Sequence, residues 1–304
     1  MKRCMGCMAE INDELTICPS CGFSPDQAQR EFSLYPDRLP SETILGGRYI
    51  LGRLLSATDF SMIYLAWDAL LEMRVSIREY FPSVFAFRQA PETNVRFYDS
   101  VMHEQFELGR QSFEEEGQKV FLIQYLQEVP DYYRIIREFN TSYIVMEYLE
   151  GITLEEYKKS GMKSRNLTIE TILEHIRYGL NQIHKNGMLH LNLSPDNIYL
   201  CDAGRICLMD SGNAKSEFYR LAKCEPDIYR EEYIAPEVIE GKKGSRNSDF
   251  YSLGCIMYYL YTGYSPERKN LKFLKGITDK KSALAKTIRI MTQLKPENRM
   301  NGIN

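Results

Sequence analysis

The sequence predicts an α+β protein in which a small cysteine-rich module precedes a strand-rich half and then a mostly helical half. Two C-x-x-C pairs lie within the first 21 residues, short apolar runs of strand length follow from Tyr49, and helical spacing dominates beyond Gly151. With 304 residues, the chain is long enough for more than one domain.

Composition is ordinary for a globular protein, with 44% hydrophobic and 26% charged residues. A formal net charge of −3 gives no electrostatic case for binding nucleic acid or an anionic membrane. The N-terminus lacks the apolar region of a signal peptide, and the most apolar window, residues 251–263, is too short to span a bilayer. We therefore expect a cytoplasmic protein without a membrane segment. Its scattered cysteines should be reduced: Cys201, Cys207, Cys224 and Cys255.

Residues 1–23 have the spacing of a structural zinc ribbon. Cys4, Cys7, Cys18 and Cys21 form two C-x-x-C pairs separated by ten residues, which places four thiolates on two tight turns around one metal. Because all four would be ligands, no position stays open for water and the site would be structural. Two disulfides, or four incidental cysteines, are the alternatives that this spacing disfavours.

The segment between the two pairs is acidic, since it contains Glu10, Asp13 and Glu14 but no lysine or arginine. This charge argues against nucleic acid as a partner and favours protein docking or packing against the rest of the chain. Residues 24–45 are polar, contain three prolines and show no sustained period. We interpret them as a linker.

The half that begins at Tyr49 has strand patterns around one helix. The helix is predicted for residues 103–126, where Phe106 and Phe113 have helical spacing. The last two strands are expected to form a hairpin across the turn Asn140–Thr141. The predicted strands are residues 48–55, 61–68, 74–81, 132–139 and 142–149.

The second half is mostly helical. Residues 169–187 place Ile172, Ile176 and Ile183 on one face, and the terminal Gly187 suits a helix C-cap. Two short strands are expected at residues 197–200 and 205–209, around a "DAG" turn. Residues 251–263 are predicted to form a buried helix.

An ordered series of motifs resembles the eukaryotic-type Ser/Thr protein kinases, particularly the bacterial ones fronted by a zinc ribbon. "FEEEG" resembles the helix that carries the partner glutamate, here Glu116, and "LHLNLSPDNIYL" resembles the catalytic loop. "LMDSG" resembles the metal-binding turn, "APE" ends at Glu237, and Asp249 stands at the anchor of the buried helix. The family pairs an arginine, here Arg299, with that glutamate. Such a series is far more specific than any single motif.

The resemblance covers residues 49–304 and implies a two-lobed kinase-like fold. Its β-rich N-lobe would comprise residues 46–150 and its helical C-lobe residues 151–304. A last helix usually follows the arginine in this family, so we expect a fragment truncated before that helix. The positions that the resemblance implies for nucleotide are Ser56, Thr58, Ser61, Met146, Glu147 and Leu149.

The groups that touch phosphate depart from the family pattern. Ser56, Thr58 and Ser61 replace the three glycines that let a backbone approach phosphate, so we favour an ordinary polar turn there. Phe60 remains in this loop and could cap the cleft. Arg78 replaces the lysine of V-A-I-K; it keeps a positive charge that could pair with the partner glutamate, but its planar guanidinium fits phosphate differently.

The catalytic loop is also altered. Asn192 replaces the catalytic aspartate, and general-base help of this kind is typically worth about 10²–10⁴ in rate. Leu191 replaces an arginine, and Ser194 replaces the lysine that steadies the γ-phosphate. The activation segment, residues 217–237, contains no serine or threonine. Because the arginine that would pair with a phosphorylated residue is also missing, we expect no regulation by Ser/Thr phosphorylation of this segment.

Two positions that the family uses for Mg²⁺ are kept. Asn197 and Asp210 supply the oxygen ligands that a hard cation prefers, although Asp210 could equally be a plain turn residue. The resemblance thus implies structural zinc, with ATP and Mg²⁺ as further candidate ligands.

Three functions follow from these replacements. The favoured one is a pseudokinase that acts as a regulatory or scaffold module with residual ATP and Mg²⁺ binding. The alternatives are a weakly active Ser/Thr kinase or other nucleotide transferase, since phosphoryl transfer depends mostly on positioning, and an interaction protein that binds no nucleotide. The sequence does not identify the protein partner.

Overall fold

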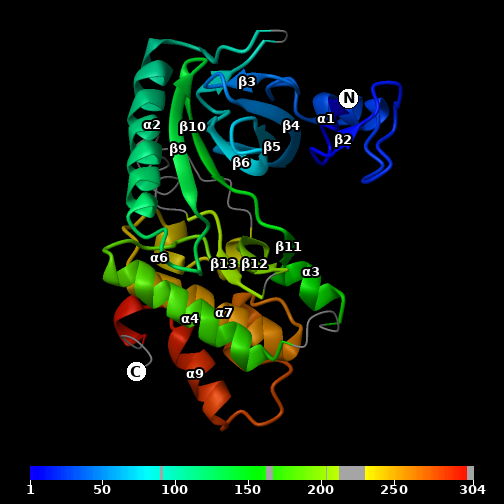
Figure 1. Cartoon of the computed structure of the whole chain (residues 1–304). Coiled ribbons are helices and arrows are strands. Elements are labelled where there is room, and N and C mark those ends of the chain that lie inside the picture. The colour runs from blue at the N-terminus through cyan, green and yellow to red at the C-terminus, as the bar shows by residue number, and fades with distance from the viewer. Residues whose placement is uncertain (90–91, 162–166, 203, 212–229, 300–304) are drawn as a thin grey trace. The chain divides into compact units, whose positions relative to one another are not determined.

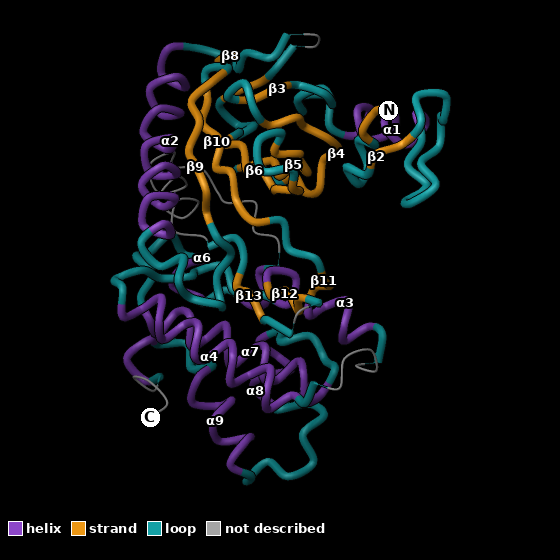
Figure 2. The backbone as a smooth tube through the Cα atoms, viewed as in Figure 1, coloured by secondary structure: helices purple, strands orange, loops and turns teal. Residues whose placement is uncertain are grey.

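The chain divides into two compact units in the computed structural model, the first rich in strands and the second rich in helices (Figure 1). The structure describes residues 1–89, 92–161, 167–202, 204–211 and 230–299. The first unit comprises Met1–Phe121 and Asp131–Tyr148, and the second comprises Leu122–Pro130 and Leu149–Asn304. Figure 2 shows the strands of the first unit and the helices of the second. Among the described residues, no helix is both long and apolar enough to cross a membrane.

The first unit contains a six-stranded antiparallel sheet with the order β3-β4-β5-β6-β10-β9. All five predicted strands are present. The helix α2 (Ser100–Phe121) begins and ends a few residues earlier than predicted, and buries Phe106 and Phe113. A Cβ at Gly117 would lie 2.9 Å from Ile144 Cδ1, so glycine allows α2 to approach the sheet closely. The strands are β3 (Ile44–Leu45), β4 (Tyr49–Ala57), β5 (Ser61–Asp68), β6 (Met73–Tyr80), β9 (Tyr132–Glu138) and β10 (Thr141–Glu147).

The β9–β10 hairpin turns one residue earlier than predicted. Phe139 and Asn140 have φ values of 52° and 60°, and Thr141 already pairs with Glu138. Two consecutive positive φ values define a turn whose twist matches that of the strands. The turn is therefore Phe139–Asn140, and the asparagine supplies one of its two left-handed positions.

The cysteine-rich module packs against the sheet in the first unit. Its short hairpin, β1 (Lys2–Arg3) and β2 (Glu10–Ile11), encloses the turn that carries Cys4 and Cys7, and the turn that carries Cys18 and Cys21 follows it. The Arg53 N–H of β4 donates to the Met5 carbonyl over 2.8 Å, and a Cβ at Gly52 would lie 2.5 Å from that oxygen. The module thus covers part of the β4 edge, which would otherwise expose unpaired backbone groups.

Residues 24–45, interpreted as a linker from the sequence, contain regular secondary structure. They contain the helix α1 (Pro25–Leu34), whose capping box joins Ser24 and Gln27. Proline at the first position of a helix costs no hydrogen bond, so Pro25 marks a helix start here rather than a linker. Leu39, further along the segment, is fully buried.

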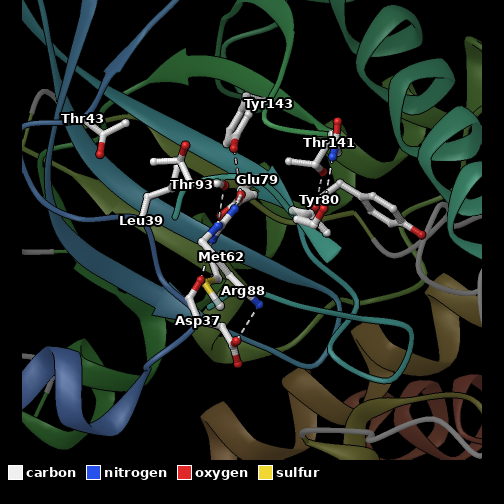
Figure 3. A network of polar contacts seen from close by, with 12 residues as sticks. Asp37, Leu39, Thr43, Met62, Glu79, Tyr80, Arg88, Thr93, Thr141 and Tyr143 are labelled. Carbon is white, nitrogen blue, oxygen red and sulfur yellow. Dashed lines mark hydrogen bonds and ion pairs between the residues drawn. The ribbon is translucent and has the colours of Figure 1, made fainter. Parts of the chain in front are cut away.

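A buried polar network holds the end of this segment against the sheet (Figure 3). Glu79 of β6 is fully buried; it forms an ion pair with Arg88 and accepts hydrogen bonds from Tyr64 (2.8 Å) and Tyr143 (2.9 Å). The Arg88 N–H donates to the Asp37 carboxylate over 2.8 Å. The loop that carries Arg88 also contains a small two-stranded sheet, β7 (Ala86–Phe87) and β8 (Arg96–Phe97).

The second unit is mostly helical. Helix α4 (Ile169–Lys185) is followed by Gly187 at φ 74°, which confirms the predicted cap. Helix α7 (Arg246–Thr262) is buried along most of its length, as predicted for residues 251–263. The remaining elements are β11 (Gly151–Thr153), α3 (Leu154–Lys159), η1 (Pro195–Asn197), β12 (Ile198–Cys201), β13 (Ile206–Leu208), η2 (Glu231–Tyr233), α6 (Pro236–Ile239), α8 (Arg268–Phe273), α9 (Ala283–Met291) and η3 (Pro296–Asn298).

The predicted pairing of Glu237 with Arg299 is confirmed. The two guanidinium nitrogens lie 2.7 Å and 2.9 Å from the two carboxylate oxygens, so the ion pair is bidentate. Ser248 of α7 also donates to Glu237, over 2.7 Å. The pair therefore joins the α6 region and the end of the described chain to the buried helix.

Candidate functional site

The four cysteines of the first module have the geometry of a tetrahedral metal site. Their sulfur atoms all lie within 4.8 Å of one another; those of Cys4 and Cys21 are 3.7 Å apart, and those of Cys7 and Cys18 are 3.8 Å apart. Zinc–sulfur bonds of about 2.3 Å arranged in a tetrahedron place sulfurs about 3.8 Å apart. The two shorter separations match this value, so the donor set suits zinc.

Backbone N–H groups favour a thiolate at Cys18, whereas burial opposes ionisation of the other three cysteines. The Gly6 N–H donates to Cys4 Sγ over 3.3 Å. Burial raises the pKa of Cys4, Cys7 and Cys21, whereas at Cys18 the effect of burial is outweighed by the N–H groups of Cys21 and Ser20, which lower its pKa to about 6. A bound cation would favour deprotonation of all four.

The β4–β5 loop satisfies its own backbone donors. Thr58 Oγ1 accepts the N–H groups of Phe60 (3.2 Å) and Ser61 (3.1 Å), and the Thr58 N–H donates to the Ser61 carbonyl over 2.9 Å. Ser56 is paired with Ile63 in the strand register. Two N–H groups that a glycine-rich loop would offer to phosphate are thus occupied by the Thr58 side chain.

Arg78 lies buried on β6 in an aromatic and polar setting. Its Nη1 is 3.5 Å from Glu116 Oε1 of α2, and its Nε donates to Ser61 Oγ over 3.4 Å. Its guanidinium lies 5.5 Å from the centre of the Phe113 ring. The ion pair expected from the sequence is therefore present, although it is long.

The suggestion that Phe60 caps the cleft is wrong. Phe60 is fully buried, and its ring contacts Tyr80 and Phe113 edge-on, with centroids 5.3 Å and 6.3 Å away. The Phe81 N–H also donates to the Phe60 carbonyl over 3.0 Å. Burial of an aromatic side chain in the core of the first unit outweighs its exposure at the loop tip.

The last three predicted nucleotide positions, Met146, Glu147 and Leu149, belong to different units. Met146 is buried on β10, and the Glu147 N–H donates to the Asp131 carbonyl over 2.7 Å, both within the first unit. Leu149 belongs to the second unit, where it packs with Cys201 and Cys207. Met146 and Glu147 are therefore positioned by the sheet of the first unit, and Leu149 by its neighbours in the second.

Asp249 of α7 anchors the catalytic-loop segment in the second unit. Its carboxylate accepts the N–H groups of His190 (2.9 Å) and Leu191 (2.7 Å), and lies 2.7 Å from His184 Nε2. Leu191 has a φ of 59°, a conformation that a branched side chain rarely adopts without support. The Asp249 anchor was predicted, whereas His184 was missed because only a helical pattern surrounds it in the sequence.

Asn192, Asp210 and Asn197 form one connected cluster. Asn192 Nδ2 donates to both the carbonyl and the Oδ2 carboxylate oxygen of Asp210, each over 3.0 Å. Asn197 Nδ2 donates to the Asn192 carbonyl over 2.8 Å, so the Asn197 side-chain oxygen takes no part in this bond. The structure therefore brings these three predicted residues together. The amide of Asn192 occupies the position where the family has its catalytic aspartate.

The other two replaced positions of this loop have structural roles. The Leu191 side chain lies against Gly244, where an added Cβ would come within 2.5 Å of Leu191 Cδ2. Ser194 is 4% exposed, and its carbonyl accepts the Asn197 N–H over 3.1 Å. Residues 212–229, which include most of the activation segment, lie outside the described residues. The expectation that this segment is not regulated by Ser/Thr phosphorylation stays a prediction.

Comparison with known proteins identifies the family. The model of the protein kinase domain matches residues 101–301. The chain therefore belongs to the protein kinase domain family.

Individual relatives are bacterial Ser/Thr kinases. The chain is 26% identical to the serine/threonine-protein kinase PrkC of Bacillus subtilis over 73% of its length, and 27% identical to a probable serine/threonine-protein kinase of Clostridium acetobutylicum over 86%. It spans only 31% and 39% of those two proteins. Among solved structures, the apo form of PpkA shares the fold with a TM-score of 0.72 and 23% identity, covering 86% of this chain and 95% of that one.

Proposed function

We propose that this chain is a pseudokinase, a kinase-fold regulatory or scaffold module that retains weak ATP and Mg²⁺ binding. The observation that carries the proposal is the bond from Asn192 Nδ2 to the Asp210 carboxylate. An amide at this position cannot take a proton from an attacking hydroxyl, and it also occupies one oxygen of the residue expected to hold the metal.

Three further residues support the same conclusion. The Thr58 side chain occupies backbone N–H groups of the loop over the phosphates. Leu191 and Ser194 are buried where the family has cations. Loss of the base, the cations and the phosphate loop together removes several contributions to transition-state stabilisation, rather than one.

Residual nucleotide binding is supported by what is kept. Arg78 and Glu116 still form an ion pair, and Asn197 and Asp210 still offer an amide and a carboxylate oxygen. A weakly active kinase is the second candidate, because positioning alone contributes much of phosphoryl transfer.

Zinc is the metal we propose for the four-cysteine site. Four thiolates in a tetrahedron favour zinc over the hard cations. All four positions are filled by protein ligands, so its role would be structural.

Label transfer from ATP tests the proposed loss of catalysis. The protein is incubated with α- or γ-labelled ATP, Mg²⁺ or Mn²⁺ and generic acceptor proteins, and the Asp210→Ala variant serves as the inactive control. We expect no transfer above that control. Transfer by the wild-type chain that disappears in Asp210→Ala would overturn the pseudokinase proposal in favour of a weak kinase.

A further inference from the structure

A groove separate from the residues discussed above lies where the cysteine-rich module meets the sheet of the first unit. It has a volume of about 490 Å³, within the range of ligand sites. Both modules contribute to it, and it is lined by Arg3, Met5, Glu42, Ile44, Ile50, Trp67, Ala69 and Glu72.

The floor of the groove is an apolar row across three strands. Ile44 of β3 pairs with Ile50 of β4, which in turn pairs with Trp67 of β5. Directly paired residues point to the same face of a sheet, so the three side chains lie side by side. Ile44 is 56% exposed, and Leu70 and Leu71, just beyond Trp67, are 70% and 58% exposed. Such an apolar surface is typical of an interaction site.

The metal-binding module supplies one wall. The Arg3 guanidinium lies 3.5 Å from the centre of the Trp67 ring, and its Nη1 donates to the Met8 carbonyl over 3.0 Å. Arg3 is thus held against the indole. The position of this wall depends on the turns formed by Cys4 and Cys7, which we propose to be fixed by zinc.

The rim is acidic. Glu42 and Glu72 both line the groove and are exposed. Within the part of the chain that the structure describes, neither carboxylate has a hydrogen-bond or ion-pair partner. Two unpaired negative charges beside an apolar floor complement a ligand that carries positive charge next to apolar groups.

We propose that this groove binds a short peptide segment of a partner protein, in which one or two apolar side chains are flanked by lysine or arginine. The apolar side chains contact Ile44, Ile50 and the exposed part of Trp67. The flanking cations face Glu42 and Glu72. This surface goes beyond the proposed pseudokinase function and does not depend on it.

The single tryptophan of the chain, Trp67, makes the proposal directly measurable. The zinc-loaded chain is titrated with a pool of capped octapeptides, free of tryptophan and tyrosine, in which two central residues drawn from Leu, Ile, Met and Phe are flanked by lysine and arginine. A matched pool has glutamate and aspartate as its flanks. We expect saturable change of Trp67 emission with the basic pool, weakened by salt, and none with the acidic pool.

Charge reversal separates a specific groove from general attraction. The double variant Glu42→Lys/Glu72→Lys should bind the basic pool about tenfold more weakly and gain response to the acidic pool. The control Glu104→Lys/Glu115→Lys has the same change in net charge at exposed positions of α2 outside the groove, and should bind like the wild type. All four substitutions are at exposed residues, and unchanged unfolding temperatures confirm that the variants fold.

Two results would overturn the proposal. One is the absence of a saturable emission change with the basic pool at millimolar concentration. The other is equal binding by the Glu42→Lys/Glu72→Lys variant and its control. Neither result bears on ATP binding, so the pseudokinase proposal is tested separately.

Discussion

At the scale of one residue, Asn192 is held by hydrogen bonds in a cluster with Asp210 and Asn197. An aspartate here would place a second carboxylate beside Asp210, and the two charges would repel each other unless a cation lay between them. The amide instead donates two 3.0 Å hydrogen bonds to Asp210. The cluster is thereby stabilised without the metal.

Replacing Asn192 by aspartate should make the stability of the cluster depend on a bound cation. In the absence of divalent cations, we expect Asn192→Asp to lower the free energy of unfolding by about 1–3 kcal/mol, because the two hydrogen bonds from the Asn192 amide are lost and a second carboxylate lies beside that of Asp210. Added Mg²⁺ or Mn²⁺ should restore stability to the variant more than to the wild type, as measured by thermal unfolding with and without metal.

The matched control is Asn12→Asp, which adds the same charge on an exposed turn. It should leave the response to metal unchanged. If Asn192→Asp gave no greater response to metal than this control, the account of the cluster would be wrong.

At the scale of an element, the tip of the β4–β5 hairpin is held by one of its own side chains, that of Thr58. Thr58 Oγ1 accepts two backbone N–H groups at the tip, and the buried Phe60 ring fixes the loop to the core. The sequence predicted a polar turn here, since threonine and serine favour such turns. It gave no means to predict the burial of Phe60, because that depends on rings contributed by β6 and α2.

We predict that Thr58→Val lowers the free energy of unfolding by about 1 kcal/mol, because two N–H groups lose their acceptor while the shape of the side chain is kept. Urea unfolding measures this change. Thr58→Ser, which retains the oxygen, is the control and should lie close to the wild type. Equal destabilisation by serine and valine would show that the hydroxyl group has no such role.

The cysteine-rich module contacts β4 of the sheet, which suggests a second prediction at this scale. Removal of the metal with a chelator should lower the unfolding temperature of the first unit, since Arg53 and Gly52 contact this module. Differential scanning fluorimetry before and after chelation measures the shift, and added zinc should restore it.

A Cys4→Ser/Cys7→Ser variant provides the control for chelation. It should unfold at the lower temperature from the start and should not respond to chelator. An unchanged unfolding temperature of the wild-type chain on chelation would contradict the structural role of the metal.

At the scale of the whole molecule, buried contacts between distant segments support the kinase scaffold. The buried pair of Glu237 and Arg299 belongs to that scaffold. Burial opposes ionisation of Glu237, but hydrogen bonds from Arg299 and Ser248 outweigh it and hold the pKa of Glu237 below its usual value of 4.5. The stability from this carboxylate is therefore present above about pH 4.5 and lost as the pH falls through the lower, folded-state pKa.

We predict that Glu237→Gln lowers the free energy of unfolding at neutral pH by about 3–5 kcal/mol, because Arg299 is left buried without its partner. The difference from the wild type should shrink below about pH 4.5, where the wild type also loses the charge. Glu240→Gln, at an exposed ion pair with Lys242, is the control and should cost under about 1 kcal/mol. Equal effects of the two variants in urea unfolding would contradict the role of the buried pair.

The sequence predicted the strands, the buried helix and the four-cysteine spacing, because periodicity and motif order reflect local constraints. The pairing of Glu237 with Arg299 was implied by the resemblance to the protein kinase family and is present in the structure. The helix within residues 24–45 was not predicted, because their prolines were counted as linker signals, although one of them starts a helix. The groove around Trp67 depends on the register of three strands and on contacts of the metal-binding module, neither of which a single sequence specifies.

Whether the chain still binds nucleotide tests the central claim most directly. The zinc-loaded protein and its Asp210→Ala variant are titrated with ATP, with and without Mg²⁺ or Mn²⁺, while thermal unfolding is followed. ATP at ten times its Kd would stabilise the folded state by about 1.4 kcal/mol. We predict a metal-dependent rise in unfolding temperature that is lost in Asp210→Ala. No shift at millimolar ATP would contradict residual nucleotide binding and leave a scaffold that acts through protein surfaces alone.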